Sequence, residues 1–234
     1  MVAEREYARL VPDSYHPLEL RGTRVWVHPA DRTDFPLLPE IQAAFDGVQN
    51  LLDFRIRRDV HFVVYGSCED AARSLGIRVA NTFLLAPLHT SNEAFVVMRS
   101  PRLHALNAYP DRMLRHLCHE LSHVCCAERT GSTKSLGDGN VGMRFPVWVD
   151  EGFAECVSAR VANRPEIITR ALSECPEATV EPRLLRELNV NLPELDSSER
   201  ERAFSVATAI VWRAVERHGL SRVFNELQSP ERWA

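Results

Sequence analysis

The sequence lacks a long apolar run. A membrane-spanning helix needs about 20 consecutive apolar residues, and a secretory signal peptide needs an apolar stretch of about 7–15 residues near the N-terminus. Neither occurs in the 234 residues, and charged side chains interrupt the N-terminal segment between Glu4 and Arg9. We therefore expect a cytoplasmic protein that does not bind a membrane.

An excess of basic residues is also missing. The chain has 28 lysine and arginine residues against 32 aspartate and glutamate residues, which gives a formal net charge of −4. Proteins that bind nucleic acids through the phosphate backbone usually carry a basic excess. The composition therefore predicts that nucleic acid is not a partner.

The six cysteines lack the Cys-x-x-Cys spacing that is typical of cysteine metal clusters. Cys118 and Cys125 share the apolar face of a predicted helix, away from the histidines of that helix, which disfavours a Cys–His nucleophile pair. Cys126 and Cys156 also lie in predicted helices. We expect free, buried thiols, as in proteins of a reducing compartment, although an even number of cysteines also permits disulfides.

The hydrophobic pattern predicts an α+β fold in a single domain over residues 1–234. Alternation with β-branched residues favours strands, whereas apolar residues three and four apart favour helices. The predicted strands are 24–28, 60–65 and 94–99, and the predicted helices are 37–54, 68–75, 111–128, 147–163, 166–174 and 199–218. This order predicts an N-terminal lobe with a mixed β-sheet, about 20–105, followed by a helical C-terminal lobe, about 110–234.

The central motif is His119-Glu120-Leu121-Ser122-His123, an HExxH pattern on a predicted helix. Residues four apart project from one helix face, so His119 and His123 can both place a ring nitrogen on one Zn²⁺ ion. Glu120 then stands beside the metal-bound water, where it suits a general base that later protonates a leaving amine. The alternative interpretation is two histidines in ordinary core or surface contacts.

A second segment, 146–156, supplies acidic residues for the same site. Catalytic zinc sites use three protein ligands and leave the fourth position to water, and Glu151, at the start of the next predicted helix, is the candidate third ligand. Glu155 lies four residues further on the same face, where we expect it to accept the free N–H of a ligand histidine. Asp150 is an alternative ligand on another side of the helix, and a solvated acidic face is the alternative to a site.

These motifs resemble those of the gluzincin metallopeptidases, the thermolysin-like and aminopeptidase-like superfamily. HELSH is followed by a glycine-containing loop and by the pattern W-x-x-EGFAE at 148–155. The match covers 111–162, and 204–227 also resembles the helix pair of small bacterial peptidase MA-like members. The resemblance implies a zincin-like fold and a zinc-dependent peptidase that acts on a peptide or protein substrate.

The resemblance also implies roles for particular residues. It implies Zn²⁺ bound by His119, His123 and Glu151, with Glu120 as general base and acid. It further implies that the strand at 94–99 borders the cleft and pairs with an extended peptide substrate.

One departure from the family pattern affects the expected activity. Gluzincin peptidases have a tyrosine or histidine after the glutamate helix that stabilises the oxyanion, but no tyrosine follows Tyr109 here. His218, His116, Arg144 and Tyr109 are the candidates for that donor, and His218 also fits a cap at a helix end. Loss of one oxyanion donor typically lowers the rate by about 10²–10³-fold. The alternatives are therefore a weakly active or non-catalytic zinc-binding scaffold, or a regulatory protease with one dedicated protein substrate; no feature indicates an oligomeric state.

Overall fold

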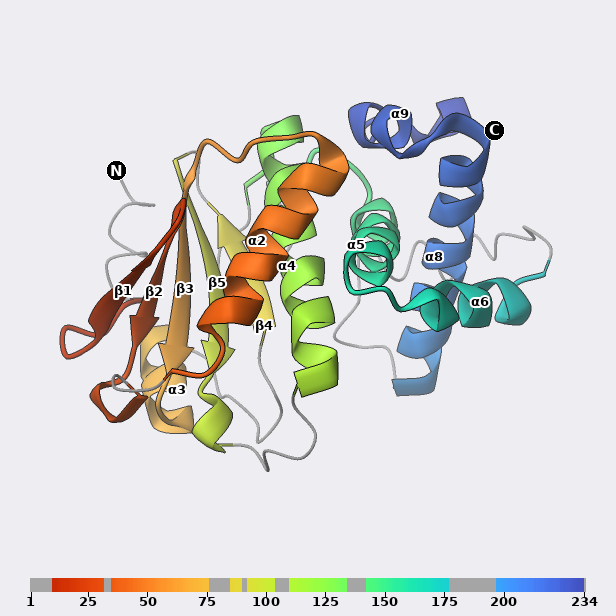
Figure 1. The fold of residues 1–234 in the computed structure, drawn as a ribbon. Coiled ribbons are helices and arrows are strands. Elements are labelled where there is room, and N and C mark those ends of the chain that lie inside the picture. The colour runs from red at the N-terminus through yellow and green to blue at the C-terminus, as the bar shows by residue number, and fades with distance from the viewer. Residues whose placement is uncertain are drawn as a thin grey trace.

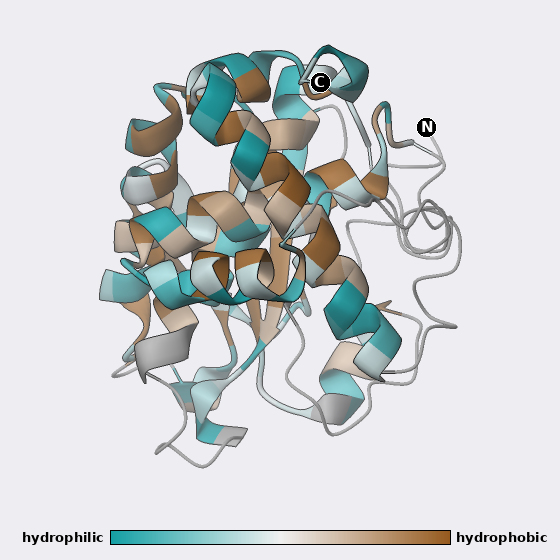
Figure 2. Ribbon diagram, turned by 90° about the vertical axis from the view of Figure 1, so that its right-hand side faces the viewer, coloured by the Kyte–Doolittle hydropathy of each residue, from teal (hydrophilic) through white to brown (hydrophobic). Residues whose placement is uncertain are grey.

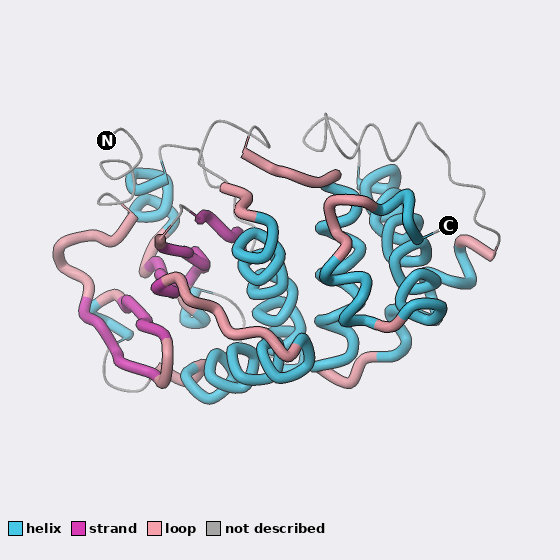
Figure 3. The backbone as a smooth tube through the Cα atoms, turned by 90° about the horizontal axis from the view of Figure 1, so that it is seen from above, coloured by secondary structure: helices cyan, strands magenta, loops and turns pink. Residues whose placement is uncertain are grey.

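The computed structural model describes residues 10–31, 35–75, 85–89, 92–103, 110–133, 142–176 and 197–233. Within these ranges, a five-stranded sheet lies at one side of the molecule and most helices lie at the other (Figure 1; Figure 3). The strands are β1 (His16–Leu20), β2 (Thr23–Val27), β3 (Asp59–Tyr65), β4 (Leu85–His89) and β5 (Glu93–Arg99). The α-helices are α2 (Leu38–Leu52), α3 (Cys68–Leu75), α4 (Pro110–Thr130), α5 (Val147–Val161), α6 (Pro165–Glu174), α8 (Ser197–His218) and α9 (Leu220–Asn225).

The α+β class is confirmed, and each predicted strand and helix is present with its ends within two residues of the prediction. Short 3₁₀ helices occur at Pro29–Asp31, Pro101–Leu103 and Pro230–Trp233. None of the helices in the described part of the chain is long and apolar enough to cross a membrane.

The sheet has the strand order β1-β2-β3-β5-β4. β2, β3 and β5 run parallel, and the outer strands β1 and β4 pair antiparallel to their neighbours. Neither outer strand was predicted from the sequence, and each contains a proline, Pro17 in β1 and Pro87 in β4. Proline cannot donate to the strand ladder, so it weakens the sequence signal while remaining compatible with an edge strand.

This topology corrects one expectation. The strand predicted at 94–99 is β5, which lies inside the sheet between β3 and β4. Its backbone hydrogen-bonding groups are used on both sides, so β5 cannot pair with a substrate. The expectation that this strand binds an extended peptide is therefore wrong, because the segment 85–89 occupies the position beside it.

The two faces of the sheet pack against different helices. In β3, Phe62 and Val64 join the main hydrophobic cluster under α2 and α4, whereas Val63 and Tyr65 face α3 on the other side. Successive strand residues point to opposite faces, so this alternation is the expected period of two. The main cluster continues through α5 to α8 and α9. The helices on this side of the molecule carry hydrophobic residues interleaved with hydrophilic ones (Figure 2).

α5 lies between α4 and α8, and contacts both (Figure 1). It approaches α8 closely at Gly152, where an added Cβ would lie only 2.6 Å from the carbonyl oxygen of Ala207. A residue without a side chain is therefore required at this contact. Since Gly152 directly follows Glu151, the α5–α8 contact also determines where Glu151 stands relative to α4.

Candidate metal centre

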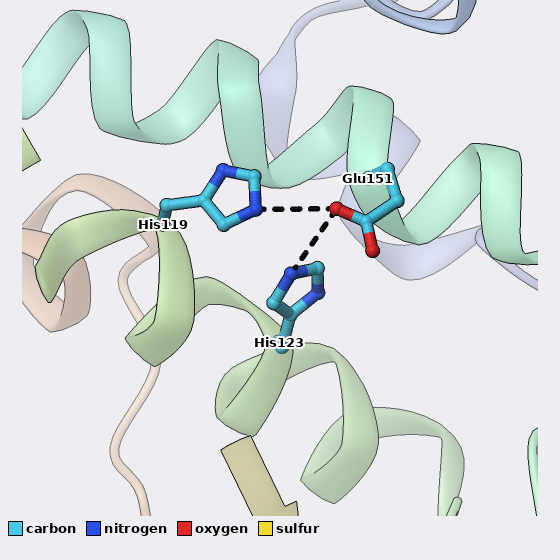
Figure 4. Close-up of side chains that lie close together, drawn as sticks. All are labelled: His119, His123 and Glu151. Atoms are coloured by element: carbon cyan, nitrogen blue, oxygen red, sulfur yellow. Dashed lines mark hydrogen bonds and ion pairs between the residues drawn. The ribbon is translucent and has the colours of Figure 1, made fainter. Parts of the chain in front are cut away.

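His119 and His123 lie on one face of α4, and Glu151 reaches them from the first turns of α5 (Figure 4). Oε2 of Glu151 is 3.2 Å from Nε2 of His119 and 3.5 Å from Nε2 of His123. All three side chains are shielded from solvent, with exposed fractions of 12%, 3% and 10% for His119, His123 and Glu151. The structure thus brings together the three residues that the sequence singled out as metal ligands.

The spacing of these three donor atoms suits a bound metal ion. The donor atoms lie within 4.8 Å of one another. Atoms bound at about 2.0–2.1 Å in a tetrahedral arrangement are about 3.3 Å apart, which is close to the two distances from Glu151. Two imidazoles and one carboxylate are also the ligand set of many catalytic zinc sites. The residues present therefore fit a divalent ion such as Zn²⁺.

The second nitrogen of each histidine ring faces a further carboxylate of α5. Nδ1 of His119 is 3.1 Å from Oε1 of Glu155, and Nδ1 of His123 is 2.8 Å from Oδ2 of Asp150. A carboxylate at Nδ1 favours a proton there and leaves Nε2 for a metal. Glu155 occupies the position expected from the sequence, whereas Asp150, considered there as an alternative ligand, lies beside the other nitrogen of His123.

The ion pairs of the centre change the pKa values of its members. Burial lowers the pKa of His119, but the contacts with Glu151 and Glu155 outweigh burial and raise this pKa to about 9. The pKa of His123 is likewise raised well above its ordinary value, because Asp150 and Glu151 outweigh burial. Burial raises the pKa of Glu151 and Glu155, but the histidines hold the first well below its usual range and the second, helped by Arg115, at about 2. Without a metal, protonated rings face ionised carboxylates.

Glu120 is buried and lines a cleft of about 730 Å³ next to the centre. His119 lies in the wall of the same cleft, so Glu120 borders both the metal centre and the space for a ligand. The cleft lies among α4, α5, α6 and α8 and is lined by Arg115, His116, His119, Glu120, Glu155, Arg164, Glu166, Ile167, Arg170, Ala171, Arg200, Glu201, Phe204, Ser205 and Thr208. Its wall combines arginines, carboxylates and hydroxyls with the apolar side chains of Ile167, Ala171 and Phe204.

The four candidates for an oxyanion donor have different positions. His116 lines the cleft. Nε2 of His218 lies 3.2 Å from the carbonyl oxygen of Trp233, near the end of the chain. The guanidinium of Arg144 lies against Gly131. Gly131 follows His123 by eight residues, which corresponds to about 12 Å along a helix axis. Tyr109 lies outside the described residues.

The cysteines behave as packing residues. Cys118, Cys125, Cys126 and Cys156 are free and buried, as expected, and Cys175 is free and partly buried. Burial raises the pKa of the Cys118 thiol to about 12 and raises the pKa of the other three buried thiols as well. A thiol that stays protonated is a poor nucleophile, so the buried cysteines do not form a catalytic pair.

Two residues of the centre differ from the sequence prediction: Arg115 was not predicted, and Asp150 was predicted only as an alternative metal ligand. Arg115 binds Glu155, with 2.9 Å between Nη1 and Oε2, and Asp150 pairs with His123. Arg115 precedes His119 by four residues, so the same rule that paired the two histidines would have placed it on their face. The position of Asp150 beside Nδ1 of His123 could not be predicted in this way, because it depends on how α5 packs against α4.

Comparison of the sequence with models of known protein families and with curated proteins found no match. The resemblance to gluzincins therefore rests on the sequence motifs of α4 and α5.

Proposed function

We propose that this protein is a zinc-dependent peptidase of the gluzincin type, in which His119, His123 and Glu151 hold the ion. The observation that carries the proposal is the convergence of these donor atoms beside a cleft that Glu120 lines. A solvated acidic surface would leave its carboxylates in water, whereas Glu151 is only 8% exposed and Glu120 only 9%. Burying charged groups without partners is costly, so this burial supports a role for them.

A Zn²⁺ ion bound by these residues would lower the pKa of a coordinated water and polarise the scissile carbonyl. Glu120 removes a proton from the attacking water as the water oxygen bonds to the carbonyl carbon. It then transfers that proton to the amide nitrogen, so that the C–N bond breaks and an amine leaves. Glu155 and Asp150 keep the rings of His119 and His123 in the orientation that presents Nε2.

The edge strand β4 supports an extended peptide as substrate. In the described part of the sheet β4 has one neighbour, β5, which leaves its other edge available for pairing. β4 also packs against α4, the helix that carries the HExxH motif. An extended chain that adds to this edge would therefore run close to the catalytic helix. The mixed sheet, the antiparallel edge strand and the two motif helices together favour a zincin-like fold with a sheet lobe and a helical lobe.

The test compares the wild type with Glu120→Gln. We expect both proteins to bind one Zn²⁺ ion per chain, measured by atomic emission after dialysis, and only the wild type to cleave a mixed peptide library, measured by mass spectrometry. Glu216→Gln is the matched control, since Glu216 is exposed on α8, and it should cleave as the wild type does. Cleavage by Glu120→Gln at the wild-type rate would remove Glu120 from the mechanism, and a wild type without zinc would end the proposal.

A non-catalytic zinc-binding scaffold is the second candidate. It is favoured by the position of His218, which contacts the Trp233 carbonyl, and by the lack of tyrosine after Tyr109. On this proposal the wild type and Glu120→Gln bind zinc equally, and neither cleaves any peptide of the library.

A further inference from the structure

Arg115 connects the wall of the cleft to the metal centre. It lies on α4 one turn before His119 and lines the cleft. Its Nη1 donates to both carboxylate oxygens of Glu155, at 2.9 and 3.2 Å, and its Nη2 lies 3.0 Å from Nε2 of His116. Since a guanidinium has no acceptor atom, Nε2 of His116 must accept this hydrogen bond. One side chain thus holds two neighbours of the centre.

Glu155 connects Arg115 to His119, a candidate metal ligand. Its Oε1, which accepts from Arg115, is also 3.1 Å from Nδ1 of His119. A glutamate side chain has several rotatable bonds, and ordering it has an entropic cost that a second contact helps to offset. The planar guanidinium is well suited to fix both neighbours, because Nη1 donates to the carboxylate of Glu155 while Nη2 donates to His116. The exposed fractions of the Arg115, Glu155 and His119 side chains are 21%, 16% and 12%, so water competes little with these contacts.

Other arginines at the cleft form ion pairs of a different kind. Arg164 pairs with Glu166. Arg170 pairs with Glu174 at 2.7 Å and, more loosely, with Glu201 at 3.6 Å. The side chains of these pairs are 36–73% exposed, more than those of Arg115 and Glu155, and the pairs lie at the start of α6, along α6 and between α6 and α8. The ion pair of Arg115 differs from these, because its partner Glu155 also contacts His119 of the centre.

We propose that Arg115 is a positioning residue of the metal centre. It holds Glu155 against Nδ1 of His119 and thereby keeps Nε2 of that ring aimed at the ion. The inference rests on the proposed function, because it presupposes that His119 binds a metal. Arg115 acts through Glu155, so its effect on the metal depends on the presence of that carboxylate.

A double-mutant cycle on zinc affinity tests this dependence. Affinities of the wild type, Arg115→Gln, Glu155→Gln and the double variant are measured by competition with a chromophoric chelator. Loss of a group that orients a ligand typically weakens metal binding by about 10–100-fold. We expect a loss of about tenfold for Arg115→Gln, a larger one for Glu155→Gln, and no further loss in the double variant. Unchanged affinity in Arg115→Gln, or losses that multiply in the double variant, would overturn the inference.

Two further variants separate positioning from charge and from general damage. Arg170→Gln removes another arginine of the cleft and should leave zinc affinity unchanged. Arg115→Lys keeps the positive charge without the fork, so its affinity should stay closer to that of Arg115→Gln than to the wild type; full recovery would refute the positioning role. The visible absorption of bound Co²⁺ should shift in Arg115→Gln and not in Arg170→Gln. A wild type that binds no metal ends the proposed function as well, whereas zinc binding that is insensitive to Arg115 ends this inference alone.

Discussion

Zinc binding is expected to release protons from the centre. In the metal-free protein the pKa of His119 is about 9 and that of His123 is raised well above its ordinary value, so both rings favour the protonated form near neutral pH. Glu151 and Glu155 have lowered pKa values and are already ionised. Because an imidazole must be neutral to bind a metal, we expect about two protons to leave for each Zn²⁺ ion bound at pH 7.

The number of released protons determines the pH dependence of zinc affinity. With two protons released, the apparent association constant rises about 100-fold per pH unit near pH 7. His119 alone accounts for about tenfold per unit up to pH 9, because its deprotonation at pH 7 costs about 3 kcal/mol. The dependence becomes weaker once the pH passes the pKa of His119.

Calorimetry in two buffers with different ionisation enthalpies gives the proton count directly, and chelator competition at several pH values gives the slope. Glu155→Gln is the informative control, since it removes one of the acids that raise the pKa of His119 and should reduce the proton count. Between about pH 6.5 and 8, a histidine with an ordinary pKa is mostly neutral, whereas one with a raised pKa is mostly protonated. If the heat of binding does not depend on the buffer and the zinc affinity does not depend on pH in this range, the rings are neutral in the free protein. The account of the ion pairs would then be refuted.

Three other predictions concern stability and the support of the centre. The raised pKa of His119 stabilises the metal-free protein fully below pH 6.5, and this stabilisation is lost as the pH rises through 9. Urea unfolding with a chelator should therefore show a free energy of unfolding about 3 kcal/mol lower at pH 9.5 than at pH 6. A free energy of unfolding that does not change with pH would contradict the raised pKa of His119. Asp150→Asn leaves the His123 ring without its carboxylate and should weaken zinc binding about 10–100-fold by chelator competition; wild-type affinity would show that this contact does not orient the ligand. Gly152→Ala places a Cβ 2.6 Å from the Ala207 carbonyl oxygen and should lower the free energy of unfolding by about 1–3 kcal/mol, whereas an unchanged melting temperature would mean that α8 moves away freely.

The sequence predicts the helices and the inner strands well because their periodicity reflects burial. Phe62 and Val63 point to opposite apolar layers, so β3 is apolar along its length and is recognised as a buried strand. The edge strands β1 and β4 have a weaker signal, since each carries a proline and pairs on one side within the described sheet. Their absence from the prediction led to the wrong role for β5, because the sequence does not reveal which strand forms the edge.

The candidate centre could be predicted where all the information lies along one helix. His119 and His123 are four residues apart, and so are Glu151 and Glu155, so helix geometry alone aligns each pair. The contact between Asp150 and His123 crosses from α5 to α4. Neighbouring residues of a helix point about 100° apart, so Asp150 and Glu151 point in different directions from α5. When α5 packs against α4, Asp150 comes to lie beside His123.

Helix packing therefore governs the centre more directly than the sheet does. Each carboxylate with a recorded ion pair to His119 or His123 comes from α5, namely Asp150, Glu151 and Glu155. α5 in turn is held against α8 at Gly152, next to the candidate ligand Glu151. A substitution at this contact on α8 would displace all three carboxylates together without touching the centre. A substitution in the sheet that displaces α4 would move the two histidines as a pair.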